Sequence, residues 1–350
     1  MAKLTKSDFE ASRSEKVQEL QRQLNEKNNI LKNYQKEHGV LEVFFDRVID
    51  AIKPIAPPKL YVKNQSRSET QTVAVMQNSD WHTGEVQDAA EVEFINEYSP
   101  KIQEKRIKKM DEIFMRWLEH MQRGYNINTV HVICTGDMIS GDIHQELSVT
   151  NAYPVPVQCC EAARMFAESI AYKAQSVHKL VIDYLVPDNH SRLTKKPQMK
   201  ESGMNSFNYV VAMMAKQYLA EFKNVTFNIH TEIERVIDVN GTKYLVSHGN
   251  NIVGWMGVPW YSIERHIGKE AKARQFLIMQ DIERAGTIGF NKYIFGHWHT
   301  DFNSEFYACS ASLSGTSAYD HAQGRFSQPG QPAWLIHGKY GEMNRTNINP

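Results

Sequence analysis

Five short polar clusters in this sequence combine residue types that bind metal ions. They are Asp80-Trp81-His82, Gly136-Asp137, Asn189-His190, His248-Gly249 and Gly296-His297-Trp298-His299. Within the first and last clusters the donors are two residues apart, so in an extended segment both side chains point to the same side. A mixture of carboxylate, amide oxygen and imidazole suits Mn, Fe, Zn or a related ion, whereas Ca²⁺ prefers oxygen alone. The clusters therefore predict a metal site with seven donors: Asp80, His82, Asp137, Asn189, His248, His297 and His299.

Each cluster follows a segment that the hydrophobic pattern predicts to be a strand. These segments are residues 72–77, 129–135, 179–186, 243–247 and 292–295, and further strands are expected at 225–229, 305–309 and 333–337. Loops after the carboxyl ends of strands are where α/β folds place their sites. We therefore expect the five clusters to meet along one edge of the sheet structure.

Helical patterns alternate with these strands. Ser99 and Pro100 are typical of a helix start, and Gly124 is expected to end that helix. Other helices are expected near 157–175, 206–222 and 262–284. Alternation of strands and helices predicts an α/β fold with a largely central sheet.

The first 70 residues differ from the rest in composition and hydrophobic pattern. Residues 8–38 are polar and lack Gly and Pro, which predicts a long exposed helix. Its apolar residues fall near heptad spacing but Lys27 interrupts them, so the helix either forms a short coiled coil for self-association or packs on the body. We expect an N-terminal helical arm and linker over 1–70 and one domain over 71–345, with a homo-oligomer formed through the arm as one outcome.

Composition limits the classes of protein. Lys+Arg and Asp+Glu balance at 40 each, which gives no support for bulk nucleic-acid binding but allows a local basic patch. The start MAKLTKSDFE lacks the apolar stretch of a signal peptide, and no apolar run approaches the roughly 18–20 residues that cross a bilayer. The four cysteines lack zinc-ribbon spacing and are expected to be reduced thiols of a cytoplasmic protein that does not bind membranes.

The order of the clusters, D-X-H, G-D, N-H, H and G-H-X-H, resembles the calcineurin-like metallophosphoesterase superfamily over about residues 72–340. This resemblance implies two packed mixed β-sheets flanked by helices, an αββα sandwich. It implies one ion held by Asp80, His82, Asp137 and His299, and another held by Asp137, Asn189, His248 and His297. Asp137 would bridge two divalent ions. Manganese is the expected metal, with iron, zinc and magnesium as alternatives.

The implied reaction is hydrolysis of a phosphate ester. Two ions can lower the pKa of a water that they share, and the resulting hydroxide would attack phosphorus. His190 follows a ligand and is the expected general acid for the leaving oxygen. The superfamily commonly has an acidic residue at the place of Ser140, so Asp142 is expected to hold and charge His190 instead. The superfamily also commonly has an acidic residue right after Asn-His, where this chain has Ser191-Arg192. Arg192 is expected to clamp a phosphate oxygen, or else to be a solvated loop arginine.

The expected substrate is a nucleic acid or nucleotide. Residues 186–205 and 312–315 resemble phage- and prophage-encoded members related to DNA-repair exonucleases, which suggests the cytoplasm of a phage-infected cell. Lys195, Lys196 and Lys200 could follow a nucleic-acid backbone, and residues 255–260 could stack on a base or simply pack. The alternatives are a phosphomonoesterase, a small-nucleotide phosphodiesterase and a metal-binding scaffold without activity.

Overall fold

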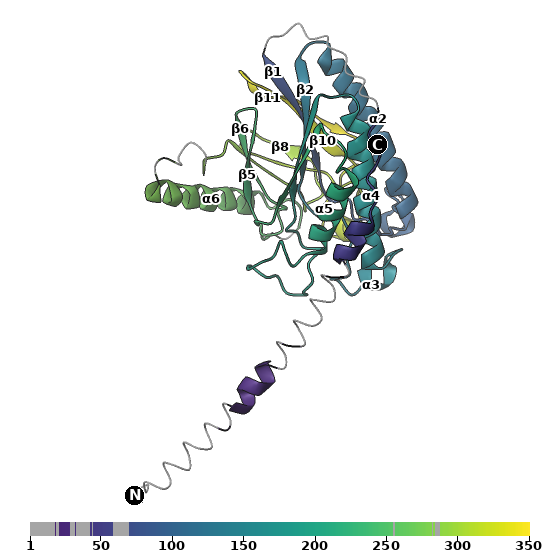
Figure 1. Cartoon of the computed structure of the whole chain (residues 1–350), viewed down its shortest axis with the longest axis vertical. Coiled ribbons are helices and arrows are strands. Elements are labelled where there is room, and N and C mark those ends of the chain that lie inside the picture. Colours follow the sequence, from purple (N-terminus) through teal and green to yellow (C-terminus); the bar gives the residue numbers. More distant parts are fainter. Residues whose placement is uncertain are drawn as a thin grey trace, which may run out of the picture. The chain divides into compact units, whose positions relative to one another are not determined.

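In the computed structural model of the chain, two mixed β-sheets form the centre of the unit Lys53–Pro350 (Figure 1). The first sheet has the order β11-β10-β1-β2-β3-β4, and the second has the order β5-β6-β7-β9-β8. The strands of the first sheet are β1 (Gln71–Asn78), β2 (Asn126–Cys134), β3 (Lys179–Leu185), β4 (Val225–His230), β10 (Gln331–His337) and β11 (Gly341–Ile348). Those of the second sheet are β5 (Arg235–Val239), β6 (Thr242–Val246), β7 (Lys292–Phe295), β8 (Phe302–Asn303) and β9 (Tyr307–Cys309).

The strands that lead to the polar clusters run parallel to their neighbours. β1, β2, β3 and β4 are parallel, while β10 is antiparallel to β1 and β11 to β10. In the second sheet β6, β7 and β9 are parallel, with antiparallel β5 and β8 at the edges. Parallel strands end at the same edge, so the loops that follow them gather there.

Helices flank both sheets. Figure 1 shows α2 (Pro100–Gln122), α4 (Val155–Ala174) and α5 (Phe207–Tyr218) beside the first sheet, and α6 (Trp260–Gln280) on the side of the second. The shorter elements are η1 (Ala89–Val92), α3 (Leu147–Thr150) and α8 (Ala318–Ala322). Ser99 caps α2 and Pro100 is in its first turn, as expected. The expected fold, two packed mixed sheets flanked by helices, is confirmed.

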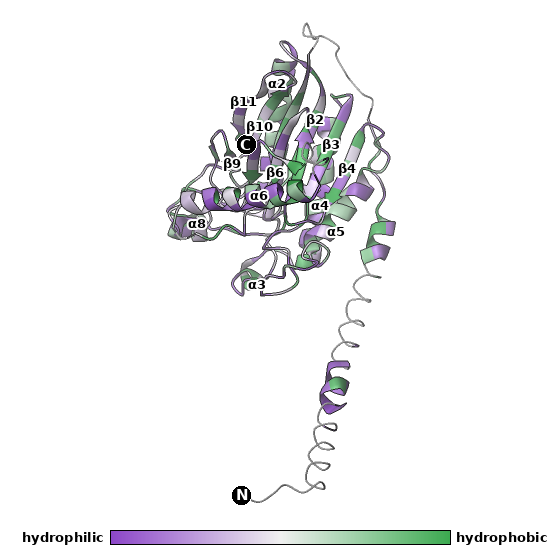
Figure 2. Cartoon of the chain, turned by 90° about the vertical axis from the view of Figure 1, so that its left-hand side faces the viewer, coloured by the Kyte–Doolittle hydropathy of each residue, from purple (hydrophilic) through white to green (hydrophobic). Residues whose placement is uncertain are grey.

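The core lies between the sheets. One buried cluster joins residues of β1, β2 and β10 to residues of β5, β6 and β7, with Trp334 and Tyr244 among its largest members. β1 is buried along seven of its eight residues because it lies inside the sheet and is covered on both faces. Such strands read as continuous apolar runs. Hydrophobic residues accordingly colour β2 and β3 green in Figure 2.

The sequence predicted eight of these strands and the four long helices, and it missed three strands. β8 has two residues and β11 carries the largely polar sequence GEMNRTNI, so neither has the apolar pattern of a buried strand. β5 differs, because its sequence RVIDV alternates Ile237 and Val239 into the core and Asn240-Gly241 joins it to β6, so the sequence did carry a signal for this strand. β11 also ends at Ile348, beyond the expected domain end at 345.

The structure describes residues 18, 21–28, 32, 43, 45–58, 70–254, 256–281, 283 and 288–350. Residues 1–52 form a separate unit, in which the described residues up to Ala51 are helical. Most of the predicted arm lies outside the described residues, and its role in self-association stays a prediction. Within the described parts, no helix is both long and apolar enough to cross a membrane.

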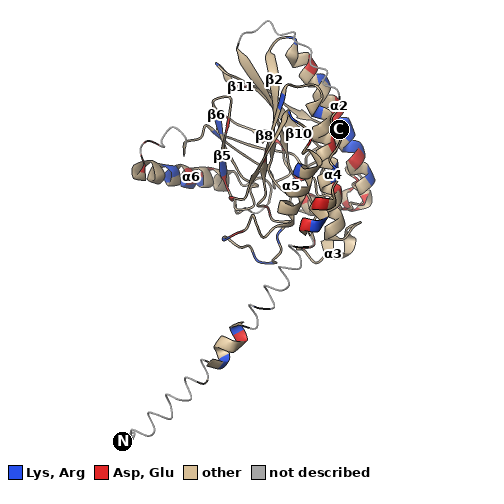
Figure 3. Ribbon diagram, viewed as in Figure 1, with Lys and Arg blue, Asp and Glu red and all other residues tan. Residues whose placement is uncertain are grey.

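The lysine-rich stretch that begins α2 shows how charge is distributed on the helices. Lys101, Lys105, Lys108 and Lys109 are exposed, and Figure 3 shows positive and negative residues interspersed along this helix. Lys108 pairs with Glu104 one turn away. The stretch is therefore mainly a solvated face, whereas Arg106 donates to the carbonyls of two residues that follow β9.

Candidate metal centre

The loops that follow β1 and β2 are held together by backbone hydrogen bonds. Asp80 N donates to Gly136 O, and His82 N donates to Asp137 O, both at 3.0 Å. These bonds continue the parallel pairing of the two strands beyond their ends. They bring the clusters Asp80-Trp81-His82 and Gly136-Asp137 side by side.

A first group of donors consists of Asp80, His82 and His299. His82 Nε2 and His299 Nε2 lie 3.0 Å apart, and His299 Nε2 lies 3.4 Å from Asp80 Oδ1. All three ligand atoms lie within 4.8 Å of one another. The loop after β1 supplies two of these residues and the loop after β7 supplies the third, so the group joins loops of both sheets.

A second group consists of Asp137, His248 and His297, with Asn189 beside it. His248 Nε2 lies 3.0 Å from Asp137 Oδ2 and 2.9 Å from Asn189 Oδ1. The ligand atoms of the three titratable residues again lie within 4.8 Å of one another. The seven donors expected from the sequence therefore converge in two adjacent groups.

Asp137 connects the two groups. It also forms a group within 4.8 Å with His82 and His190, so its carboxylate faces ligands of both proposed ions. Asp137 is 1% exposed, and its Oδ2 lies 3.0 Å from His248 Nε2 but meets hydrogen-bond geometry with no described residue. A buried carboxylate is costly unless positive charge lies beside it, and metal ions at this point would supply such charge. The residues present therefore fit a pair of divalent ions.

The protonation of two of the four histidine ligands also suits metal binding. Burial, with the neighbouring His190 and His299, lowers the pKa of His82 well below its usual value, and burial beside His248 does the same for His297. These two imidazoles are therefore neutral, which is the form that binds metals. For a third, His248, burial lowers the pKa but Asp137 outweighs it and raises the pKa to about 9. Burial opposes charge on Asp137 too, but His248 and His190 hold its pKa well below the usual range.

Groups behind the ligands fix their orientation. His248 Nδ1 donates to the carbonyl of Thr135 at 2.8 Å, and His299 Nδ1 donates to Asp320 Oδ2 at 2.7 Å. Both bonds leave Nε2 facing the other donors, as in metal sites in which the second ring nitrogen sets the tautomer. Burial would lower the pKa of His299, but Asp320 and Asp80 raise it well above its usual value.

His190 lies at the centre with one ring nitrogen already occupied. Its Nδ1 donates to the carbonyl of Ser140 at 2.7 Å, and its backbone N–H donates to Asp137 Oδ1 at 3.1 Å. The expected role of Asp142 is therefore corrected. Asp142 is exposed, and the Ser140 carbonyl holds the nitrogen that Asp142 was expected to bind. The sequence missed this because a backbone carbonyl can take the role from any residue type.

Arg192 is near the site, but two of its guanidinium N–H groups bond to backbone carbonyls of its own loop. Its Nε donates to the carbonyl of Thr194, and an Nη donates to the carbonyl of Lys195. The side chain still lines the cavity beside His144 and His190. These bonds leave other guanidinium N–H groups for a phosphate, so the expected clamp stays a prediction.

Five of the seven donors line a cavity of about 780 Å³: His82, Asp137, Asn189, His297 and His299. Its wall also contains five charged residues to which the sequence assigned no role: Glu85, Glu146, Asp188, Asp320 and Arg325. Burial, together with Asp320 and Asp137, raises the pKa of Glu85 to about 7 despite His299. Asp188 accepts from the backbone N–H groups of Asp137 and Ser191, and burial beside Asp137 raises its pKa to about 6. The pKa shifts of Glu85 and Asp188 depend on residues distant in the chain, such as Asp320 and Asp137, so a local sequence motif does not reveal them.

The aromatic residues of 255–260 were expected either to stack on a base or to pack within the protein. Trp255 lies outside the described residues. Trp260 packs against Phe302 and Tyr307 of the second sheet, which is the ordinary packing that was one of the two expectations. The cavity is instead lined by Trp298 and Tyr319, with Arg325 over both rings.

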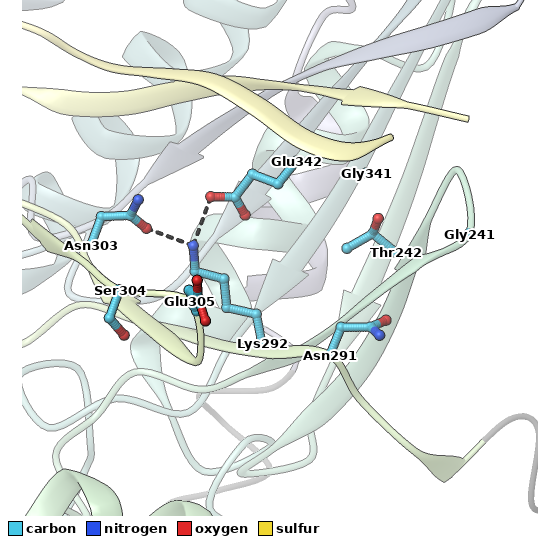
Figure 4. A pocket seen from close by; sticks show the side chains of 9 residues that line it. All are labelled: Gly241, Thr242, Asn291, Lys292, Asn303, Ser304, Glu305, Gly341 and Glu342. Atoms are coloured by element: carbon cyan, nitrogen blue, oxygen red, sulfur yellow. Dashed lines mark hydrogen bonds and ion pairs between the residues drawn. The ribbon is translucent and has the colours of Figure 1, made fainter. Parts of the chain in front are cut away.

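A different hollow, of about 620 Å³, lies at the start of β7, the end opposite to His297 (Figure 4). The only cation in its wall is Lys292, which donates to Asn303 at 2.6 Å and to Glu342 at 2.7 Å. Because these two bonds hold the ammonium group within the wall, this hollow does not offer the free charged donors that the first cavity has.

Comparisons with known proteins give only distant likenesses. No family model matches the sequence, and no curated protein matches it. Among solved structures, 79% of the chain aligns with zinc-bound Vps29 from Entamoeba histolytica (99% of that chain, 13% identity, TM-score 0.28). The same share aligns with a predicted phosphoesterase from Streptococcus pneumoniae TIGR4 (90%, 10% identity, TM-score 0.27). It also aligns with a 5'-nucleotidase assigned in Staphylococcus aureus (53%, 10% identity, TM-score 0.30). At TM-scores this low the likenesses carry no argument about function, which must rest on the site itself.

Proposed function

We propose that this chain is a dinuclear metal-dependent phosphoesterase of the calcineurin-like class that hydrolyses phosphodiester bonds in nucleic acid. One observation carries the proposal: the buried carboxylate of Asp137 is shared between two groups of donors that come from both sheets. A carboxylate shared in this way suits a pair of ions rather than one.

The residues divide into two sets of ligands around Asp137. Asp80, His82 and His299 would hold one ion, and Asn189, His248 and His297 would hold the other, with manganese as the expected metal. Bound divalent ions supply charge neutralisation at phosphate oxygens and a water of lowered pKa. Mixed nitrogen and oxygen donors of this kind suit first-row transition metals.

His190 is the proposed general acid. Because its Nδ1 donates to the Ser140 carbonyl, the proton to be transferred is carried on Nε2, which lies 3.9 Å from Asp137 Oδ2. This nitrogen therefore faces the place where the phosphate group would sit. If His190 protonates the leaving oxygen there, the leaving group does not depart as a strongly basic alkoxide.

The wall of the cavity supports a nucleic-acid substrate. Thr194, Gln198 and Met199 line it, and the lysines of the same loop, Lys195, Lys196 and Lys200, are all exposed beside it. Exposed cations next to a phosphate-binding site can follow a polyanionic backbone even when the net charge of the chain is zero. Ile233, Ile252 and Val253 give the opposite part of the wall apolar surface for a sugar or base.

The test is a substrate panel with the full chain and Mn²⁺. We expect hydrolysis of bis-p-nitrophenyl phosphate and of labelled single- or double-stranded DNA to exceed hydrolysis of p-nitrophenyl phosphate. Hydrolysis of the monoester alone would favour a phosphomonoesterase, and no hydrolysis at full metal loading would favour a scaffold.

His190→Ala tests the acid. We expect kcat to fall about 10²- to 10⁴-fold on a substrate with a poor leaving group, with the metal content unchanged. The loss should be smaller for p-nitrophenolate esters, whose leaving group needs no proton. His120→Ala, at an exposed histidine of α2, is the matched control and should behave as wild type. Unchanged kcat in His190→Ala on all substrates would show that another group delivers the proton.

A further inference from the structure

α6 is held to the body by an unusually polar face. Of its 21 residues, the buried ones are Ile263, His266 and Glu270. A helix normally buries an apolar stripe. His266 and Glu270 are four residues apart, so their side chains lie on the same side of the helix. This face lies outside the proposed phosphoesterase site, and the proposed reaction does not use it.

Two segments face this pair. Glu234 lies just before β5, and Asn251 lies in the loop that follows β6, three residues after His248. Glu234 Oε1 is 2.7 Å from His266 Nε2 and accepts from Asn251 Nδ2, also at 2.7 Å. The ligand atoms of Glu234, His266 and Glu270 all lie within 4.8 Å of one another.

The hydrogen bonds within this cluster leave two buried polar atoms without partners. His266 is 7% exposed, and its Nε2 has no partner in hydrogen-bond geometry among the described residues, although Glu234 Oε1 is close. The two atoms therefore approach each other off the N–H direction. Asn251 Oδ1 is likewise buried without a partner. Each such buried orphan costs about 1–3 kcal/mol unless something else binds it.

Neighbouring cations satisfy only part of the charge. Arg274 bonds to Glu270 Oε2, and Lys269 Nζ lies 3.0 Å from Glu270 Oε1. The Lys269 side chain is 67% exposed, so it can turn into solvent and release that oxygen. Glu270 Oε1, Glu234 Oε1 and His266 Nε2 would then be three converging donors.

We propose that Glu234, His266 and Glu270 form a separate binding site for a divalent transition-metal ion. The Asn251 amide can add a fourth donor, because a half-turn of its side-chain amide exchanges Nδ2 and Oδ1. One imidazole with carboxylate and amide oxygens suits Zn²⁺ or Co²⁺, whereas Ca²⁺ prefers oxygen alone. The ion would fasten α6 to the turn before β5 and to the loop that carries His248.

Metal content of the full chain tests this site separately from the phosphoesterase centre. The double variant Asp80→Ala/Asp137→Ala removes the carboxylate ligands of both groups of that centre and leaves the α6 cluster and the loop that carries Asn251 unchanged. We expect it to bind one equivalent of Co²⁺ or Zn²⁺ after dialysis, with the Co²⁺ form showing visible absorption of a low-coordinate site. Adding His266→Ala or Glu270→Gln to this double variant should abolish that equivalent.

Glu264→Gln, an exposed glutamate on the same helix, is the matched control and should retain the ion. Zn²⁺ should also raise the melting temperature of the double variant, and this rise should vanish in its His266→Ala form. If the double variant binds no ion, or binds it equally with and without His266 and Glu270, the cluster is only an ion-pair network. Because the readouts are metal content and melting temperature, absent phosphoesterase activity does not affect the outcome.

Discussion

Five of the seven proposed ligands have a backbone conformation that non-glycine residues rarely adopt. Their φ angles are positive: 53° for Asp80, 45° for His82, 48° for Asp137, 68° for His297 and 54° for His299. Each such residue costs roughly 1–3 kcal/mol, and strain of this kind persists where the surroundings enforce it. Strained loops thus turn donors that are two residues apart in the sequence toward a common point.

The hydrogen bond between Asp320 and His299 should control metal affinity. Asp320 is 1% exposed and accepts from His299 Nδ1, which leaves Nε2 as the ligand atom. We expect Asp320→Asn to weaken metal binding about 10- to 100-fold, because the amide is a poorer acceptor and can select the wrong tautomer. Equilibrium dialysis against Mn²⁺ measures this.

Asp320 also belongs to the capping box of α8, so the control must separate the two roles. Ser317→Ala removes the cap and keeps the carboxylate on His299. It should reduce the free energy of unfolding by about 1 kcal/mol with little change in metal affinity. Equal losses of affinity in both variants would mean that α8 as a whole, and not the carboxylate, supports His299.

At the scale of elements, the loop after β7 must approach the loop after β1 very closely. A Cβ at Gly296 would lie 2.0 Å from Ser79 Oγ and 2.4 Å from Asp80 Oδ2. Gly296→Ala should therefore push the two loops apart, with a loss of about 1–3 kcal/mol in the free energy of unfolding and weaker metal binding. Denaturation and metal titration of the same preparation check both effects.

Gly268 offers the opposite case. It lies in α6, and a Cβ added there would meet nothing within 4 Å. Gly268→Ala should leave metal binding unchanged and stabilise the helix by up to about 1 kcal/mol. If instead the Gly296→Ala variant binds metal as tightly as the wild type, the two loops can separate without disturbing the ligands.

The strands β2, β3 and β4 are linked by Asp183. Its carboxylate bonds to His131 on β2 at 2.5 Å and to His230 on β4 at 2.7 Å. Burial raises the pKa of Asp183, but the bonds from His131 and His230 outweigh it and hold the pKa below its usual value of 3.8. A lowered folded-state pKa stabilises the native state above pH 3.8, and this stabilisation is lost as the pH falls further.

Asp183→Asn should therefore lower the free energy of unfolding by about 1.5–3 kcal/mol near neutral pH. The gap between variant and wild type should shrink as the pH drops below 3.8, because the unfolded wild-type chain then binds a proton at Asp183 that the folded carboxylate does not yet hold. Denaturant titrations across this range measure the gap. A gap that stays constant at all pH values would assign the loss to packing and not to charge.

At the scale of the molecule, the metal centre joins the two sheets. The loops after β1, β2 and β3 of the first sheet carry Asp80, His82, Asp137 and Asn189, and the loops after β6 and β7 of the second carry His248, His297 and His299. Ions that bind only the folded arrangement stabilise it by mass action. The two sheets should therefore resist separation better when the ions are bound.

Metal removal tests this coupling. Treatment with a chelator should lower the melting temperature, and excess Mn²⁺ should restore it. At a hundredfold excess over Kd, we expect the ion to add about 2.7 kcal/mol to the free energy of unfolding. Asp137→Ala should remove most of the Mn²⁺ response, because that residue faces both groups of donors. An equal response in wild type and Asp137→Ala would place the stabilising ion elsewhere in the chain.

The sequence by itself indicated the seven candidate donors, the strands that precede them and the four long helices, because these depend on residue type and on local periodicity. It did not reveal Asp188, Asp320, Glu85 or the cluster of Glu234, His266 and Glu270, and it assigned Asp142 to a place that the Ser140 carbonyl takes. Their roles depend on partners distant in the chain: Asp320, for example, lies 21 residues from His299 and Glu270 is 36 residues from Glu234. Only the packing of the two sheets and α6 brings such groups within bonding distance, because hydrogen bonds and buried charges act through space and leave no periodic trace in the sequence.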